Sequence, residues 1–235
     1  MAHEEEPATP SPPHHPLGRR SVVWLLLVSL VLIQFGYPIT DGGAGWTGVY
    51  LMFYGGLVFF SVRAAVIAPR RYWLLAAFAV SVVAGGGWFV WSPESQLALT
   101  AMLSSIGLLQ VALVVVLFRA LMDPPERANA VDLLLVAVCG FLLLGGVFGA
   151  SAALLEIADP GSFADPTLAQ TPLPWQALLY GSFVTLSALG FGDVTPVSSW
   201  ARSLFSLEGV VGVLFITVVI SRLVSVAGKA LDSEE

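Results

Sequence analysis

The chain has 235 residues, of which 57% are hydrophobic and only 11% are charged, and its mean hydropathy is +0.84. A soluble domain carries about 25% charged residues, so the composition excludes a soluble fold as the main architecture. The formal net charge of −6 at pH 7 leaves no basic face to neutralise phosphates, which argues against nucleic acid as a partner. The sequence therefore predicts an all-α integral membrane protein.

Membrane-spanning helices need about 20 apolar residues to cross roughly 30 Å of hydrocarbon. Six such runs are expected: Ser21–Tyr37, Thr47–Ala68, Tyr72–Trp91, Gln96–Leu121, Val131–Leu155 and Trp200–Ala227. The breaks between runs contain residues that end helices, such as the paired prolines Pro124 and Pro125. Residues 1–18, which precede the first run, are rich in proline and glutamate and are expected to form a disordered tail.

The basic residues predict the orientation of the chain in the membrane. Nine of the ten, all except Arg202, fall on one side when a six-span chain starts on that side. Lys and Arg are concentrated in cytoplasmic segments of membrane proteins. Both termini, including the 1–18 tail, are therefore predicted to be cytoplasmic.

The stretch between the fifth and sixth runs is too short to cross the membrane. Pro174–Ser187 is an apolar run of fourteen residues, which as a helix reaches only about 21 Å. The orientation requires both of its ends to lie outside. A re-entrant segment satisfies both conditions, with a half-helix that enters from outside and an extended strand that returns.

The expected return strand, Ala188–Asp193, carries glycines at alternating positions, Gly190 and Gly192. Alternate glycines permit positive φ and let successive carbonyls point towards one axis, where a ring of them can replace the hydration shell of a small cation. The alternative is a re-entrant loop that only packs between helices. The order of span, half-helix, glycine strand and span favours a strand that lines a path for ions over a loop that only packs.

The segment Thr185-Leu-Ser-Ala-Leu-Gly-Phe-Gly-Asp-Val-Thr-Pro196 resembles the pore signature of potassium channels. Leu207-Glu-Gly-Val-Val-Gly-Val-Leu-Phe215 and Ser221-Arg-Leu-Val224 resemble the inner helix of bacterial two-helix pore domains. The resemblance implies a pore domain over residues 131–230, with an outer helix, pore helix, filter and inner helix. Four further helices, over residues 19–122, would precede it.

The resemblance also implies roles for individual residues. Thr185, Ser187 and Asp193 would support the filter, with Asp193 bracing it at the external mouth. Potassium ions would bind at backbone carbonyls of the filter, which comprises Ala188, Leu189, Gly190, Phe191 and Gly192. Ala188 stands where the family has a threonine whose hydroxyl completes the innermost ion site, so that site is expected to bind ions more weakly.

Two residues of the last span are candidates for a part in gating. Gly212 lies nineteen residues after Asp193, which matches the spacing of the family's gating hinge. Glu208 lies one helical turn earlier, and an ionisable residue inside a span is a functional candidate. It is expected either to accept hydrogen bonds from Ser187 or Thr185, or to act in the ion path or in proton gating.

The first four spans lack the features of a voltage sensor. Gln96–Phe118 contains no Lys or Arg, although several charges per subunit must move to give steep voltage dependence. A structural bundle that shields the pore or holds an oligomer together is favoured over a ligand sensor.

Together these features predict a passive potassium-selective channel, not an enzyme, in the inner (plasma) membrane of a cell. One pore motif per chain cannot close a fourfold ring of carbonyls, so the expected partners are three further copies, in a homotetramer, and membrane lipids. No cofactor is expected beyond the permeant potassium ions. The alternatives are a weakly selective monovalent cation channel, and a non-conducting scaffold or transporter subunit with a re-entrant loop.

Overall fold

A computed structural model of the chain describes residues 17–42, 44–67, 69–123, 130–168 and 170–232. The expected N-terminal tail lies outside these residues, apart from its last two positions, which begin the first helix. The elements in chain order are α1 (Leu17–Phe35), the 3-10 helix η1 (Tyr37–Gly42), α2 (Ala44–Ile67), α3 (Pro69–Trp91), α4 (Gln96–Met122), α5 (Ala130–Ala158), β1 (Phe163–Ala164), α6 (Trp175–Leu186), β2 (Thr195–Pro196) and α7 (Ser199–Asp232).

The helices begin and end where turn-forming residues stand. Between α3 and α4, the Ser95 hydroxyl accepts a hydrogen bond from the backbone N–H of Ala98 at 3.3 Å and so caps α4. Pro174 occupies the N-cap of α6, one position ahead of where the sequence places it. A proline there gives up no helical hydrogen bond, because the first N–H groups of a helix have no partner within it.

Four helical segments are long and apolar enough to cross a membrane by length and composition: Trp73–Trp91, Gln96–Met122, Ala130–Ala158 and Ser199–Ser225. Val23–Phe35 and Gly48–Phe59, in α1 and α2, are shorter apolar stretches of the described chain. The expected count of six spans therefore stays a prediction, although each of the six expected runs overlaps an α-helix of the described chain.

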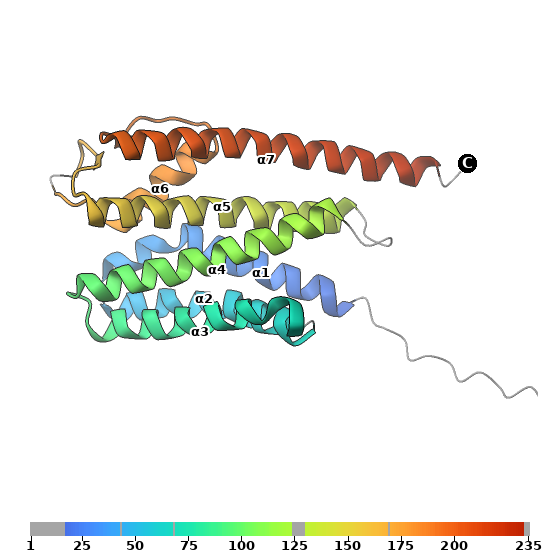
Figure 1. The fold of residues 1–235 in the computed structure, drawn as a ribbon, viewed down its shortest axis with the longest axis horizontal. Coiled ribbons are helices and arrows are strands. Elements are labelled where there is room, and N and C mark those ends of the chain that lie inside the picture. The colour runs from blue at the N-terminus through green and yellow to red at the C-terminus, as the bar shows by residue number, and fades with distance from the viewer. Residues whose placement is uncertain (1–16, 43, 68, 124–129, 169, 233–235) are drawn as a thin grey trace, which may run out of the picture.

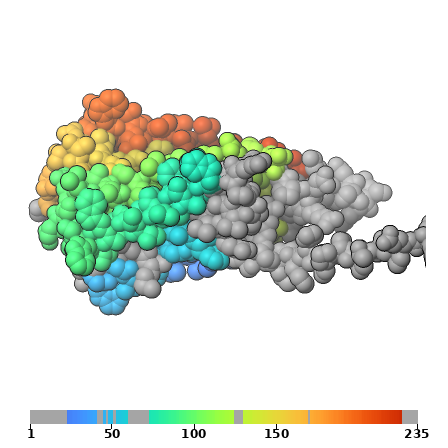
Figure 2. Space-filling view, turned by 60° about the horizontal axis from the view of Figure 1, so that its bottom comes forward, coloured from blue at the N-terminus to red at the C-terminus, as the bar shows by residue number. Residues whose placement is uncertain are grey.

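The helices run roughly side by side, with α5 inside the bundle (Figure 1). α5 packs against α1, α4, α6 and α7, whereas α2 and α3 lie on the far side of α4 and α1. The larger of two hydrophobic clusters, which includes Leu30, Leu109, Leu143 and Leu178, joins the first four helices to α5, α6 and the start of α7. α7 forms one edge of the molecule, and its side chains lie along the upper border of the surface in Figure 2.

The segment between α5 and α7 folds back on itself. β1 and β2 pair antiparallel, with Phe163 opposite Pro196 and Ala164 opposite Thr195. This small sheet ties the loop that follows α5 to the chain just before α7. Between the two strands, α6 and the residues after it form a closed excursion held against α5 and α7.

Candidate functional site: the segment between α6 and α7

α6 is short, and its start is joined to the first helices. The rings of Trp175 and Tyr50, from α6 and α2, have centroids 5.9 Å apart. The Gln176 side-chain amide donates a hydrogen bond to the Thr40 hydroxyl of η1 at 2.9 Å. The first part of the chain therefore holds the beginning of the helix that leads into the candidate filter.

The residues after α6 have an alternating backbone conformation. Ala188, Gly190 and Gly192 have positive φ values of 57°, 60° and 78°. Glycine adopts this left-handed region readily, whereas an L-alanine does so at a cost of about 1–2 kcal/mol. The alternation predicted from the two glycines is present, and it extends one step further, to Ala188.

Few backbone hydrogen bonds tie this segment to the end of α6. The Ala188 N–H donates to the Thr185 carbonyl at 3.0 Å, and the Leu189 N–H donates to the Val184 carbonyl at 3.0 Å. Leu189 and Phe191 are 60% and 65% exposed. The described chain therefore leaves the candidate filter uncovered over most of its surface.

Asp193 ends the segment and is held by a side chain of α6. The Tyr180 hydroxyl donates to one Asp193 carboxylate oxygen at 2.5 Å, and the Val194 N–H donates to the other at 2.9 Å. The bond from Tyr180 lowers the pKa of Asp193, and the same bond raises the pKa of Tyr180 to about 12. Asp193 thus fixes the exit of the loop relative to α6.

Of the two other candidate supports, Thr185 lies half-buried on the last turn of α6, and Ser187 is the exposed residue that ends it. The Ser187 hydroxyl donates to the Phe183 carbonyl at 2.6 Å, within the same helix. The expectation that Ser187 or Thr185 bonds to Glu208 is wrong, because the hydroxyl that contacts Glu208 belongs to Ser182, which faces α7 from the middle of α6.

Glu208 is fully buried, and its contact with Ser182 joins three helices. The Ser182 hydroxyl lies within hydrogen-bond distance of a Glu208 carboxyl oxygen on α7, and 2.8 Å from the Gly145 carbonyl of α5. A hydroxyl has one hydrogen, and the Gly145 carbonyl can only accept. Both contacts are satisfied when Ser182 donates to Gly145 and a protonated Glu208 donates to Ser182.

The second carboxyl oxygen of Glu208 has no hydrogen-bond partner among the described residues. A buried carboxylate with so few donors would be costly, whereas a neutral carboxylic acid is far less so. The geometry therefore fits a protonated Glu208 that links α5, α6 and α7.

Gly212 lies one turn further along α7, against the end of α6. A Cβ at this position would come within 2.1 Å of the Leu186 carbonyl oxygen. Glycine is therefore required here by close packing of two backbones, which the spacing to Asp193 does not reveal.

A second buried carboxylate, which sequence reasoning missed, organises the loop ahead of α6. Glu156, near the end of α5, accepts hydrogen bonds from the backbone N–H groups of Gly161, Phe163 and Leu173 at 2.9, 3.0 and 3.1 Å. From the sequence alone, a glutamate at the end of an apolar run is expected to lie at the membrane–water interface. Nothing in the sequence indicates that three backbone N–H groups of the loop converge on it.

The described residues hold no group of three or more His, Cys, Asp or Glu side chains that could bind a metal ion. The segment itself presents exposed backbone, and two buried carboxyl groups, Glu156 and Glu208, lie in α5 and α7.

Comparison with known proteins bears on this part of the chain. Residues 137–229, from α5 to near the end of α7, match the protein family described as ion channel. No curated protein matches the chain. The match supports a passive ion channel, and together with the apolar helices it indicates a membrane protein. The matched residues begin after α4, so the first four helices lie outside the matched region.

Proposed function

We propose that the chain is one subunit of a homotetrameric, potassium-selective channel, and that the carbonyls of Ala188–Gly192 form its filter. The observation that carries this proposal is the alternation of left-handed residues at positions 188, 190 and 192. Such alternation turns successive carbonyls to one side of the strand, and potassium filters use rings of carbonyls to replace hydrating water.

The exposure of the filter segment supports an assembly of four copies. Leu189 and Phe191 present large apolar side chains that the described chain does not cover. In a tetramer these side chains would pack behind the filter, against neighbouring copies, and the four strands would enclose the axis. Membrane lipids would cover the outer helices, and the channel needs no cofactor besides its permeant ion.

The orientation and the part played by α1–α4 belong to the same proposal. The chain lies in the inner (plasma) membrane with both termini in the cytoplasm, so that both ends of the re-entrant segment lie outside. Since α1 packs against α5, and Tyr50 of α2 lies against Trp175 of α6, the first four helices act as a structural bundle that braces the outer side of each pore unit.

Glu208 and Gly212 act in this proposal through packing behind the pore. Glu208 is a structural link from α7 to α6, and Gly212 lets the two helices approach. The spacing of Gly212 from Asp193 supports its role as the gating hinge. Substituting Glu208→Gln tests a proton-gating role. An open probability with the same pH dependence as the parent channel would exclude that role.

A weakly selective monovalent cation channel is the second candidate, and Ala188 favours it. Alanine supplies a carbonyl to the innermost ion site but no hydroxyl, so each tetramer has four fewer oxygen ligands there. Ala188→Thr is expected to raise the preference for potassium over sodium and to strengthen block by barium. Unchanged permeability ratios and unchanged block would contradict this account of position 188.

Ion flux into liposomes tests the proposed function. Purified protein should admit potassium, with slower sodium entry, and barium should block the flux. Equal entry of both ions would support the weakly selective channel. An absence of flux from a verified tetramer would overturn the proposal and leave a non-conducting scaffold.

A further inference from the structure

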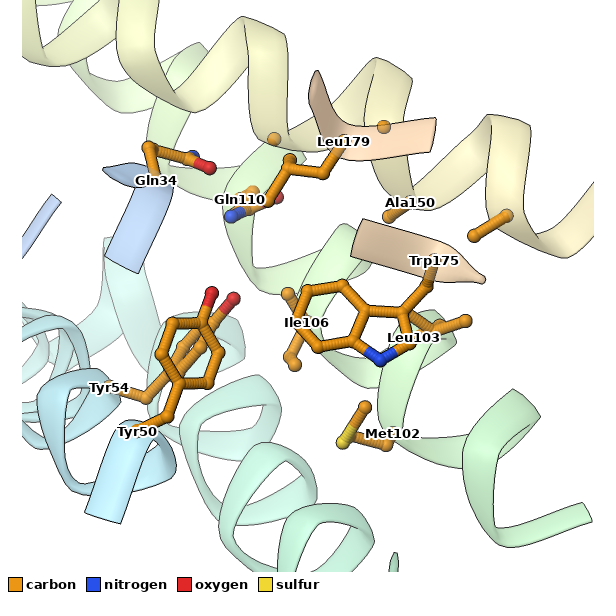
Figure 3. Close-up of a pocket in the computed structure, with 13 residues that line it drawn as sticks. Gln34, Tyr50, Tyr54, Met102, Leu103, Ile106, Gln110, Ala150, Trp175 and Leu179 are labelled. Atoms are coloured by element: carbon orange, nitrogen blue, oxygen red, sulfur yellow. The ribbon is translucent and has the colours of Figure 1, made fainter. Parts of the chain in front are cut away.

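A small cavity lies where the first helices meet the pore helix (Figure 3). Its volume is about 30 Å³, and it is lined by residues from α1, α2, α4, α5 and α6. It involves neither the candidate filter nor α7, although two lining residues, Trp175 and Leu179, lie on α6.

Two buried amides point into this cavity with unused acceptors. Gln34 and Gln110, on α1 and α4, are each 1% exposed, and the side-chain oxygen of each has no hydrogen-bond partner in the described chain. The Gln34 amide nitrogen donates to the Leu142 carbonyl at 2.9 Å. This bond fixes the orientation of the amide, so its oxygen points away from Leu142. Buried acceptors of this kind are costly unless a donor reaches them.

The two amides are close enough for one small molecule to reach both. A Cβ on Gly146 of α5 would lie 2.5 and 2.7 Å from the Gln110 amide nitrogen and oxygen, and 2.6 Å from the Gln34 amide nitrogen. Both side chains therefore converge on the same backbone position, and glycine leaves room for them. The hydroxyls of Tyr50 and Tyr54 point towards the same space (Figure 3).

The rest of the lining determines the kind of ligand that fits. Of the described residues that line the cavity, none carries a charge, and Met102, Ile106 and Trp175 supply an apolar wall. A charged ligand would lack a counter-ion there, whereas a neutral molecule with an O–H donor and a small apolar part meets both surfaces.

We propose that this cavity is a binding site for small neutral hydroxyl compounds. It takes water from the solvent and exchanges it for methanol or ethanol. One buried water needs about 10–15 Å³, so 30 Å³ holds two to three atoms of that size. Methanol and ethanol have two and three non-hydrogen atoms, whereas 1-butanol, with five, exceeds the space. Affinities for such small ligands are millimolar or weaker.

Saturation-transfer NMR on the purified full chain in detergent tests this site, with methanol, ethanol and 1-butanol as probes. Methanol and ethanol are expected to give saturable transfer from the protein, and 1-butanol only the non-saturable signal of partition into the micelle. Ala153→Leu, which fills the cavity from α5, should abolish the saturable part. Ala77→Leu, on the exposed side of α3, is the matched control and should retain it.

Gln110→Met separates a donor site from a merely apolar hole, because it removes one acceptor at nearly constant volume. Binding of ethanol is expected to weaken about fivefold, the usual effect of one hydrogen bond. Thermal unfolding of each variant checks that it folds. If Ala153→Leu does not fold, ethanol binding by Gln110→Met tests the site instead. The proposal is overturned if the wild type shows no saturable methanol or ethanol signal, if 1-butanol saturates equally, or if Gln110→Met binds as the wild type does.

Discussion

α5 and α7 are the two long helices of the ion channel domain, and they differ sharply in how much of their surface the chain itself covers. The buried share of the apolar segment is 67% in α5 and 22% in α7. α5 contacts four other helices, whereas α7 packs mainly on α5 and α6. The two sequences are similarly apolar, so composition alone does not distinguish a helix that is buried within its own chain from one that is largely exposed.

Both α7 and the candidate filter segment expose apolar side chains. Large apolar side chains line α7 along most of its length: Trp200, Leu207, Val210, Val213, Leu214, Ile216, Ile220 and Val224. Lipid can cover one side of such a helix, but an exposed loop of backbone at membrane depth has to be buried in protein or line a water-filled path. α5 is thus mostly buried within the subunit, and the exposed face of α7 is the surface through which the proposed assembly would form.

The largest effect is expected from breaking the buried side of α7. In Gly212→Ala the new methyl group would meet the Leu186 carbonyl at 2.1 Å, a backbone atom that cannot move without shifting α6. The loss of stability should be about 3 kcal/mol, measured as a fall in the thermal unfolding midpoint in detergent.

Gly209→Ala on the same helix is the matched control. Its Cβ would lie 4.0 Å from the Thr185 carbonyl oxygen, an ordinary contact. If both variants unfolded at the same temperature, close packing of α7 on α6 would not explain Gly212.

A smaller effect is expected from the carboxyl that joins α7 to α6. Glu208→Ala removes the partner of Ser182 and leaves a cavity, which should cost about 2 kcal/mol. Glu208→Gln should remain close to the wild type, because its amide can donate to Ser182 as the protonated carboxyl does. Chemical or thermal denaturation measures both, and a Gln variant as unstable as the Ala variant would show that the acid is ionised instead.

The smallest effect is expected at the exposed end of the filter segment. Tyr180→Phe removes the donor that lowers the pKa of Asp193, so that pKa should rise towards its ordinary value near 3.8. A lowered pKa in the folded protein contributes stability above the ordinary pKa, which is lost as the pH falls through the lowered one. The contact therefore persists at neutral pH and is lost only in strong acid.

Carboxyl ¹³C NMR of the labelled protein follows this titration directly. Tyr54→Phe on α2 serves as the control and should leave Asp193 unchanged. An Asp193 titration that is identical in the wild type and in Tyr180→Phe would show that Tyr180 does not set its charge.

Local signals in the sequence predict much of the architecture. Pro174 and the glycines at 190 and 192 place the short helix and the turn that follows it within a residue or two, because proline and glycine act on the backbone where they stand. The start of α4 at Gln96 and the end of α3 at Trp91 follow from the polar turn between them. These features depend on neighbours along the chain.

The contacts that hold the site together depend on packing and could not be predicted in this way. Ser182 and Glu208 are 26 positions apart, and the choice of Ser182 over Ser187 follows from which side of α6 faces α7. Tyr180 and Asp193 come together only when the loop closes. The cavity amides Gln34 and Gln110 each sit in an apolar run, where a single glutamine gives no sign of a partner.

The central claim is that four copies of this chain meet through α7 and the filter segment. The mass of the purified protein, released intact from detergent micelles and measured by native mass spectrometry, tests it most directly. The account predicts a particle of about 100 kDa, which corresponds to four chains of 24.9 kDa. A monomer at every concentration, or a stable assembly of another number of chains, would contradict it.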